Sequence, residues 1–133
     1  AARADLVSRV IRPALDRGRT VVCDRFVDST VAYQGVARGL GIVKVRELSE
    51  IATGGLMPDL TILLDVDPAV GLGRAESDDR FEAEGIRFQE LVAEGYADIA
   101  RREPARVVTV DGSGPPDEVH RRVMDVVESR LAR

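Results

Sequence analysis

Three short apolar runs, each ending in aspartate, constrain the fold of this chain more than any other feature. They read TVVCD (residues 20–24), LTILLD (60–65) and RVVTVD (106–111). Runs without polar alternation are typical of strands that are covered on both faces, and helical patterns between them predict a parallel sheet. The chain of 133 residues is long enough to bury a core within one domain. We therefore expect an α/β fold, with Cys23 as a buried, inert thiol in the first strand.

Apolar residues at helical spacing predict the elements between these strands. The first helix covers about residues 3–15, with a kink at Pro13 and a stop at Gly18. A second helix is predicted to begin near Ser29, where Ser and Thr side chains are good helix caps. The others are predicted over residues 43–53, from Pro68, after a polar break at 76–79, and after the loop at 112–116.

Charge and composition exclude several classes of protein. The net charge is −4, which argues against a general nucleic-acid-binding surface. The chain has no apolar run near the 18 residues of a membrane span and no signal-peptide pattern. Its single cysteine excludes an internal disulfide and a cysteine metal cluster.

The acidic strand ends are candidate functional positions, because ligands bind beyond the carboxyl ends of the strands in open parallel sheets. A strand end is also simply where a chain meets water, and this simpler interpretation suffices for Asp65 and Asp111. Asp24 is different, since Arg25 and a polar helix start follow it directly. We therefore expect chemistry at the end of the first run.

Three longer motifs, CDRFVDSTVAYQG, ATGGLMPDLTILLDVDP and DRFEAEG, occur in this order. In sequence and spacing they resemble bacterial thymidylate kinase, and the resemblance covers the whole chain. It implies a P-loop nucleoside-monophosphate kinase with a three-layer fold around a parallel sheet. Such an enzyme transfers the γ-phosphoryl group of ATP to dTMP with Mg²⁺, giving dTDP. The resemblance also implies a cytoplasmic homodimer with small-molecule substrates, and neither a nucleic acid nor a membrane as partner.

The resemblance assigns the phosphate end of dTMP to the first strand end. Arg25 matches the arginine that holds the dTMP phosphate, and a guanidinium can clamp a phosphate with two parallel hydrogen bonds. Asp24 matches the carboxylate near Mg²⁺, which it contacts through water. A cap on the following turn is the structural alternative for Asp24.

The resemblance assigns the nucleoside to five further residues. Arg3 matches the arginine that reads thymine O4, and its spacing from Leu6 and Val7 points it inward, where it needs an acceptor. Thr30 matches a residue that makes a polar contact to thymine. Tyr33 matches the tyrosine that packs under the deoxyribose and excludes ribose. Tyr33 and Gln34 should share a helix face with Thr30. Gln34 is a weaker candidate for thymine or backbone contact, and Ser29 is either a substrate contact or, as we favour, a helix cap.

The ATP side is assigned to a lid over about residues 74–82 and to a glycine-rich loop. Arg74 and Arg80 flank the polar break and match lid residues that stabilise charge during phosphoryl transfer. This lid is short and acidic, so either the two arginines suffice or lid residues are missing from the sequence. Gly112 and Ser113 match the loop near the adenine, although a plain strand–helix connection is an equal alternative.

The chain contains no GxxxxGK[ST] stretch, the phosphate-binding motif of P-loop kinases. The resemblance implies a sheet of five strands. We expect only three of them here, in a C-terminal part that by itself neither binds ATP nor catalyses phosphoryl transfer. In the family that this chain resembles, a further strand lies between those that match residues 20–24 and 60–65, so these two would lose their shared neighbour. Two alternatives stay open: a non-catalytic nucleotide-binding remnant, and a kinase for a related nucleoside monophosphate.

Overall fold

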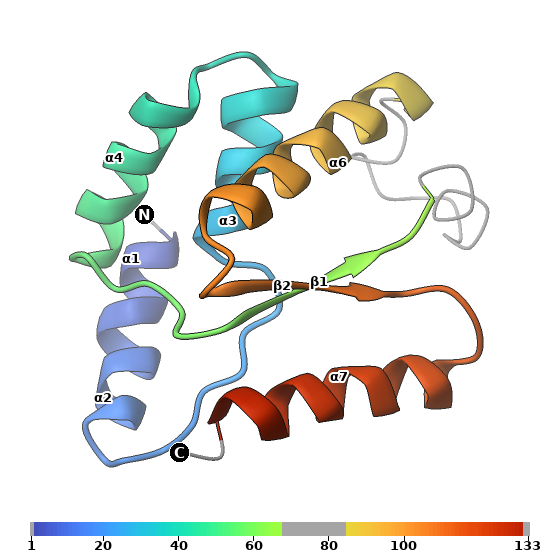
Figure 1. Cartoon of the computed structure of the whole chain (residues 1–133). Helices are drawn as coiled ribbons and strands as arrows, with labels where there is room; N and C mark the ends of the chain where they lie inside the picture. The colour runs from blue at the N-terminus through green and yellow to red at the C-terminus, as the bar shows by residue number, and fades with distance from the viewer. Residues whose placement is uncertain (1, 68–84, 132–133) are drawn as a thin grey trace. The chain divides into compact units, whose positions relative to one another are not determined.

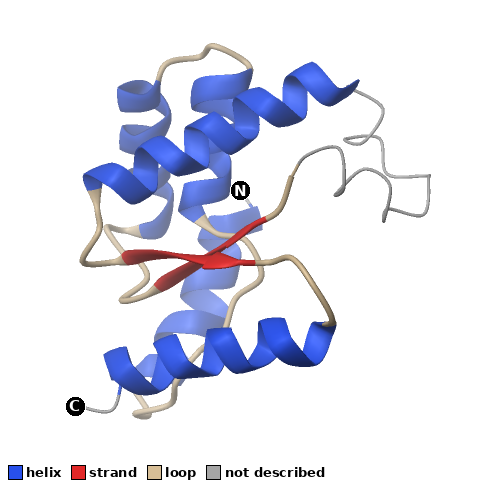
Figure 2. Cartoon of the chain, turned by 45° about the vertical axis from the view of Figure 1, so that its right-hand side comes forward, coloured by secondary structure: helices blue, strands red, loops and turns tan. Residues whose placement is uncertain are grey.

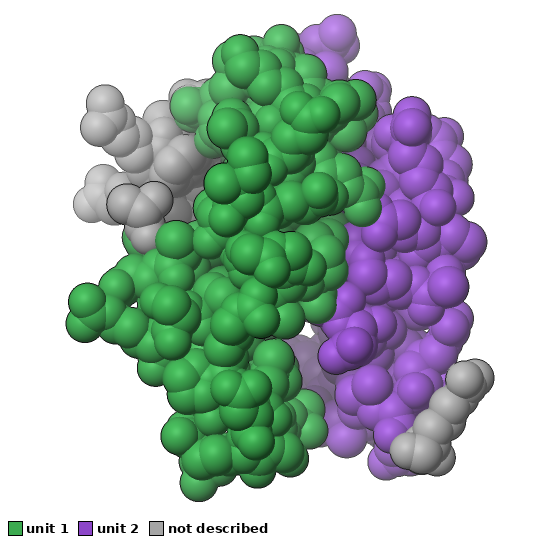
Figure 3. Space-filling view, turned by 90° about the vertical axis from the view of Figure 1, so that its left-hand side faces the viewer, with its two compact units in different colours: residues 1–57 green, residues 58–133 purple. Residues whose placement is uncertain are grey.

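The structure, a computed structural model, describes residues 2–67 and 85–131. Helices dominate these residues, and two strands form a parallel sheet (Figure 1). Contacts within the chain divide it into two compact units, residues 1–57 and 58–133 (Figure 3). Three predicted features lie outside the described residues: the helix from Pro68, the polar break at 76–79 and the lid. A single kinase domain over residues 1–133 stays a prediction.

The first helical run of unit 1 changes its hydrogen bonding ahead of its proline. It consists of α1 (Ala2–Leu6), the π-helix η1 (Val7–Ile11) and α2 (Arg12–Leu15). Pro13 has no N–H, so the carbonyl of Arg9 loses the partner that an α-helix would provide. In η1 the bonds reach one residue further than in an α-helix, and the Arg12 N–H donates to the Val7 carbonyl. The π turn thus accommodates the disturbance expected at Pro13.

Glycines end two helices of unit 1 at the predicted positions. Gly18 has φ +69° and donates its N–H to the Leu15 carbonyl over 2.8 Å. Gly54 has φ +60° and follows α4 (Ile42–Thr53) directly. The left-handed conformation is cheap for glycine and ends a helix without steric strain. The predicted stop at Gly18 and the predicted end of the later helix at residue 53 are confirmed.

The core of unit 1 comes from a few aliphatic side chains on its helices. A further helical run, α3 (Val27–Thr30) followed by the π-helix η2 (Val31–Ala37), packs against α4. The Arg12 side chain donates to the carbonyls of Thr53 and Gly54, over 3.2 and 2.7 Å, and so caps the end of α4. The buried aliphatic residues are Val7, Ile11, Val27, Val31, Ala32 and Val45.

The described residues of unit 2 form a sheet with one helix on each face. Strands β1 (Thr61–Asp65) and β2 (Val107–Asp111) are parallel and pair residue by residue, so that Asp65 lies opposite Asp111. Helices α6 (Gly85–Arg102) and α7 (Pro116–Leu131) both contact β2 and cover opposite faces of the sheet (Figures 1 and 2). The predicted parallel pairing and layering are confirmed for these two strands.

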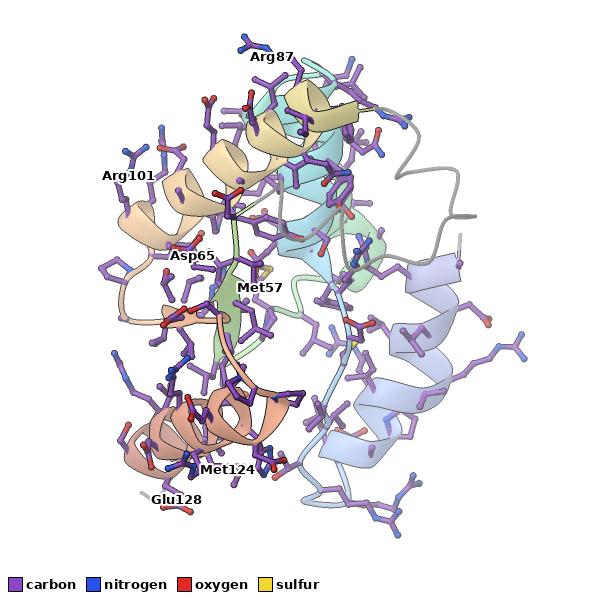
Figure 4. All side chains as sticks on the ribbon, turned by 90° about the vertical axis from the view of Figure 1, so that its right-hand side faces the viewer. Met57, Asp65, Arg87, Arg101, Met124 and Glu128 are labelled. Atoms are coloured by element: carbon purple, nitrogen blue, oxygen red, sulfur yellow. The ribbon has the colours of Figure 1, made fainter. Side chains whose placement is uncertain are left out.

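Helix α6 is two-sided. Arg87 and Arg101 point outward into solvent (Figure 4), whereas Val92 and Ile99 are buried. This distribution is typical of a helix that lies on a sheet.

No helix within the described parts of the chain combines the length and the apolarity that a bilayer crossing requires.

The predicted strand at residues 20–24 does not form. These residues are irregular, Val22 is 94% exposed and Cys23 is exposed, so the expectation of a buried thiol was also wrong. A strand is stable only when a neighbour satisfies its backbone N–H and C=O groups. Among the described residues the sheet contains β1 and β2 alone, so two of the three expected strands are present.

Candidate functional site

Arg3 is held by two contacts, one from the N-cap residue of α3 and one from its last residue. Its Nη1 atom donates a hydrogen bond to Thr30 Oγ1 over 2.5 Å. Its guanidinium carbon lies 5.4 Å from the centre of the Phe26 ring, within cation–π range. The inward direction expected for Arg3 is confirmed, because the residue is half-buried and has found an acceptor. That acceptor belongs to the chain itself.

Arg25 is held by Tyr33. Its guanidinium carbon lies 5.4 Å from the centre of the Tyr33 ring, and the side chain is exposed. The backbone of Arg25 has φ +57°, and no other non-glycine residue in the described ranges has a positive φ. The left-handed region costs an ordinary residue roughly 1–2 kcal/mol. The turn between residue 24 and α3 thus carries backbone strain at its arginine.

Neutral groups orient both arginines. Within residues 2–67 and 85–131, neither Arg3 nor Arg25 forms an ion pair with a carboxylate; their contacts are ring faces and one hydroxyl. A guanidinium has five N–H donors, and Arg3 uses one of them in its bond to Thr30. The arrangement therefore presents positive charge and donors that no described residue uses, which suits an anionic ligand with carbonyl acceptors.

Asp24 directly precedes Arg25 and is exposed. Mg²⁺ in kinases is commonly held by one or two carboxylates, substrate phosphates and several waters. A single open carboxylate beside an arginine that is predicted to bind phosphate fits that pattern. The described residues contain no cluster of three or more His, Cys, Asp or Glu side chains. The water-mediated role of Asp24 stays a prediction.

Ser29 and Gln34 lie within the helical run rather than at its start. Phe26 is the N-cap of α3 and Ser29 is its third residue, so the capping interpretation of Ser29 was wrong. Gln34 is half-buried in η2. The α-helical spacing that placed Thr30, Tyr33 and Gln34 on one face does not apply through a π-helix, whose bonds run from i to i+5. Their roles as ligand contacts stay predictions.

In unit 2, Gly112 has a packing role at the end of the sheet. Its N–H donates to the Asp65 carbonyl over 2.8 Å. A Cβ atom at Gly112 would lie 2.6 Å from Val66 Cγ2 and 3.2 Å from the Asp65 carbonyl oxygen. Asp65 is labelled at this strand end in Figure 4. Glycine is needed here because the loop after β2 runs against the chain that leaves β1.

Ser113 and Arg122 organise the rest of this loop around Asp111. The Ser113 hydroxyl and N–H both donate to Asp111 Oδ1, over 2.5 and 2.9 Å. Arg122 donates to the carbonyls of Asp111 and Ser113 and lies 3.3 Å from Asp111 Oδ2. The Ser113 hydrogen bonds, with the Arg122 charge as a lesser cause, lower the pKa of Asp111. These contacts favour the plain strand–helix connection over a role of Gly112 and Ser113 in adenine binding, which stays a prediction.

Comparison with known proteins identifies the family. The sequence model of thymidylate kinase matches residues 1–123. The chain belongs to the thymidylate kinase family. Among curated thymidylate kinases, it is 52% identical over 129 residues to that of Synechococcus sp. (strain JA-2-3B'a(2-13)), a match that covers 97% of this chain and 63% of the relative. The thymidylate kinase of Symbiobacterium thermophilum is 50% identical over 135 residues, with 100% and 63% covered.

A third thymidylate kinase, from Deinococcus radiodurans, is 46% identical over 133 residues, with 98% of this chain and 65% of the relative covered. The chain thus spans about 63–65% of the length of these relatives. Membership in the thymidylate kinase family implies the P-loop nucleoside-monophosphate-kinase fold. The parallel β1–β2 pair between α6 and α7 is consistent with part of that fold.

Sequence reasoning singled out four of the five residues that make the Arg3 and Arg25 contacts in unit 1 and missed one. The structure brings Arg3 to Thr30 and Arg25 to Tyr33. The missed residue is Phe26, whose ring contacts the Arg3 guanidinium. Its position directly after Asp-Arg in the sequence was a signal that could have found it. Arg74 and Arg80, predicted to act in the lid, lie outside the described residues.

Proposed function

We propose that this chain carries the dTMP-binding part of a thymidylate kinase, which transfers the γ-phosphoryl group of ATP to dTMP and forms dTDP. The observation that carries the proposal is the pair Arg3 and Arg25, two guanidinium groups anchored by neutral contacts in one unit. Membership in the thymidylate kinase family supplies the reaction.

In this proposal the two arginines bind opposite ends of dTMP. Arg25 pairs with the 5′-phosphate through parallel N–H donors, and Arg3 donates to thymine O4. Thr30 accepts from Arg3 and keeps its own O–H as a donor for the base, since a hydroxyl both donates and accepts. Tyr33 lies under the deoxyribose and excludes ribose, while Ser29 and Gln34 are secondary contacts.

The chemistry needs positioning and positive charge more than covalent participation by the protein. Bound Mg²⁺–ATP supplies the phosphoryl group. Arg25 fixes the dTMP phosphate oxygen that accepts it, and Asp24 orients water on the metal ion. Arg74 and Arg80 contribute positive charge from the lid, and Gly112 and Ser113 lie near the adenine.

The GxxxxGK[ST] cradle for ATP phosphates does not occur in these 133 residues. We therefore propose that the chain alone binds dTMP without turning it over. We further propose a cytoplasmic homodimer that acts on small molecules, with neither nucleic acid nor membrane as a partner.

The test measures dTMP-dependent ADP formation by the protein expressed from its whole gene, with dUMP and dCMP as competing acceptors. We expect turnover with dTMP, and a kcat/KM roughly 10²-fold lower for Arg25→Lys, because lysine lacks the planar fork. Arg17→Lys, an exposed arginine in the turn after α2, is the matched control and should retain the rate. A preference for another monophosphate, or an Arg25→Lys protein as active as the control, would refute the proposal.

A further inference from the structure

We propose that Phe26 is a positioning residue for nucleotide binding: its ring face and the Thr30 hydroxyl hold the Arg3 guanidinium in the orientation that meets the base. The inference rests on the proposed function and deepens it. It concerns a residue that no motif argument assigns to the ligand, and whose side chain acts through Arg3.

The first step is the two-point hold on Arg3. The Phe26 ring lies under the guanidinium at 5.4 Å, and Thr30 Oγ1 accepts from Nη1 at 2.5 Å. The ring contact holds the guanidinium carbon over the Phe26 face, and the hydrogen bond fixes the position of Nη1. The guanidinium is therefore oriented before any ligand arrives, and its other N–H donors have no acceptor among residues 2–67 and 85–131.

The second step is the chemical nature of the hold. A carboxylate would orient Arg3 equally well but would neutralise the charge and occupy two donors. A ring face attracts the cation through its quadrupole and uses no N–H donor. Ordering the side chain in advance also removes part of the entropy cost from ligand binding. The combination of aromatic ring and hydroxyl suits a receptor for an acceptor group rather than a structural ion pair.

The third step is the rigidity of Phe26 itself. Its ring is half-buried, it is the N-cap of α3, and the next residue, Val27, is only 1% exposed. Phe26 also follows Arg25 directly in the chain. Phe26, whose ring contacts Arg3, is thus fixed in the same turn as Arg25.

The decisive experiment weakens the ring quadrupole without changing its shape. Phenylalanine with one, two or three ring fluorines is introduced at position 26 in the protein expressed from its whole gene, and dTMP affinity is measured by calorimetry. We expect the dissociation constant to rise stepwise, by about threefold to thirtyfold over the series. The same series at Phe88, a half-buried residue of α6, is the matched control and should be flat.

A double-mutant cycle between Phe26→Leu and Arg3→Met tests whether Phe26 acts through Arg3. We expect Phe26→Leu to raise the KM for dTMP while kcat stays within about twofold of the parent, and Phe26→Tyr to have the wild-type KM. In the double variant, the losses of dTMP affinity caused by Phe26→Leu and Arg3→Met should be clearly less than additive. A purely structural role would lower stability and both kinetic constants without depending on Arg3.

The outcomes separate this inference from the proposed function. If the unsubstituted protein binds dTMP but the fluorine series at position 26 is flat, or the cycle is additive, Phe26 does not position Arg3. If the unsubstituted protein does not bind dTMP at all, the proposed function fails and the inference fails with it. If Phe26→Leu does not fold, the fluorine series still tests the inference, because it keeps the shape of the ring.

Discussion

The Nη1 atom of Arg3 lies 2.5 Å from the hydroxyl oxygen of Thr30, which links the first turn of the chain to a residue 27 positions later. This bond joins two helices that the sequence pattern treats separately. It also changes the role of Thr30, which accepts from Arg3 in addition to any contact with a base.

Replacing Thr30 by valine tests this bond directly. Valine has nearly the same shape but no oxygen, so a half-buried N–H of Arg3 loses its acceptor. We expect the free energy of unfolding to fall by about 1–2 kcal/mol in Thr30→Val, since the donor is charged, and to change little in Thr30→Ser. Urea unfolding of the three proteins measures both changes. Equal stability of the valine and serine variants would show that the bond contributes nothing.

Arg25 offers a test of backbone strain at a predicted phosphate-binding residue. Its φ of +57° is unfavourable for any residue with a Cβ. We expect Arg25→Gly to unfold with a free energy about 1 kcal/mol higher than Arg25→Ala, because glycine relieves the strain. Both variants should lose dTMP phosphorylation in the protein from its whole gene. Chemical unfolding and a turnover assay check the two halves, and an alanine variant as stable as the glycine variant would rule out strain.

Gly112 tests the close approach of the loop after β2 to the end of β1. A methyl group at this position would meet Val66 Cγ2 at 2.6 Å and force the chain apart. We expect Gly112→Ala to lower the free energy of unfolding by about 1–3 kcal/mol.

The control for this prediction is Val66→Ala, which removes the methyl group in the way. Combined with Gly112→Ala, it should recover part of the loss, so that the two effects are not additive in a thermal unfolding assay. Full additivity would mean that Val66 is not the obstacle.

Asp111 predicts a pH dependence of stability. Its pKa is lowered in the folded state by the Ser113 hydrogen bonds first and by Arg122 second. A carboxylate with a lowered folded pKa stabilises the fold above its ordinary value of 3.8, and the contribution is lost as pH falls through the folded value. Asp111→Asn should therefore be less stable than the parent at about pH 6, and the difference should shrink towards about pH 3.

Thermal midpoints across this pH range measure the difference. Asp125→Asn, which removes another exposed carboxylate from unit 2, is the matched control for the change in net charge. A difference between parent and Asp111→Asn that stays constant with pH would show that the Ser113 bonds do not depend on the ionised carboxylate.

Periodicity and helix stops were sufficient to predict much of the fold. β1 and β2 have fully apolar runs with clear ends, and α4 ends at Gly54 as its pattern requires. These features depend on residues near one another in the chain. The apolar run at residues 20–24 misled the same reasoning, because a strand also needs a neighbour, and the pattern of one segment does not say whether that neighbour is present.

The amino-acid pattern alone determines the kinase family, the two parallel strands and the inward direction of Arg3, because motif spacing and side-chain periodicity are local properties. Tertiary structure alone reveals that Arg3 meets Thr30 and Phe26, that Arg25 rests on Tyr33 with a left-handed backbone, and that Gly112 must lack a side chain. Each of these depends on how turns and packing direct groups toward one another in space. That direction follows from the three-dimensional path of the chain, which no single stretch of sequence specifies.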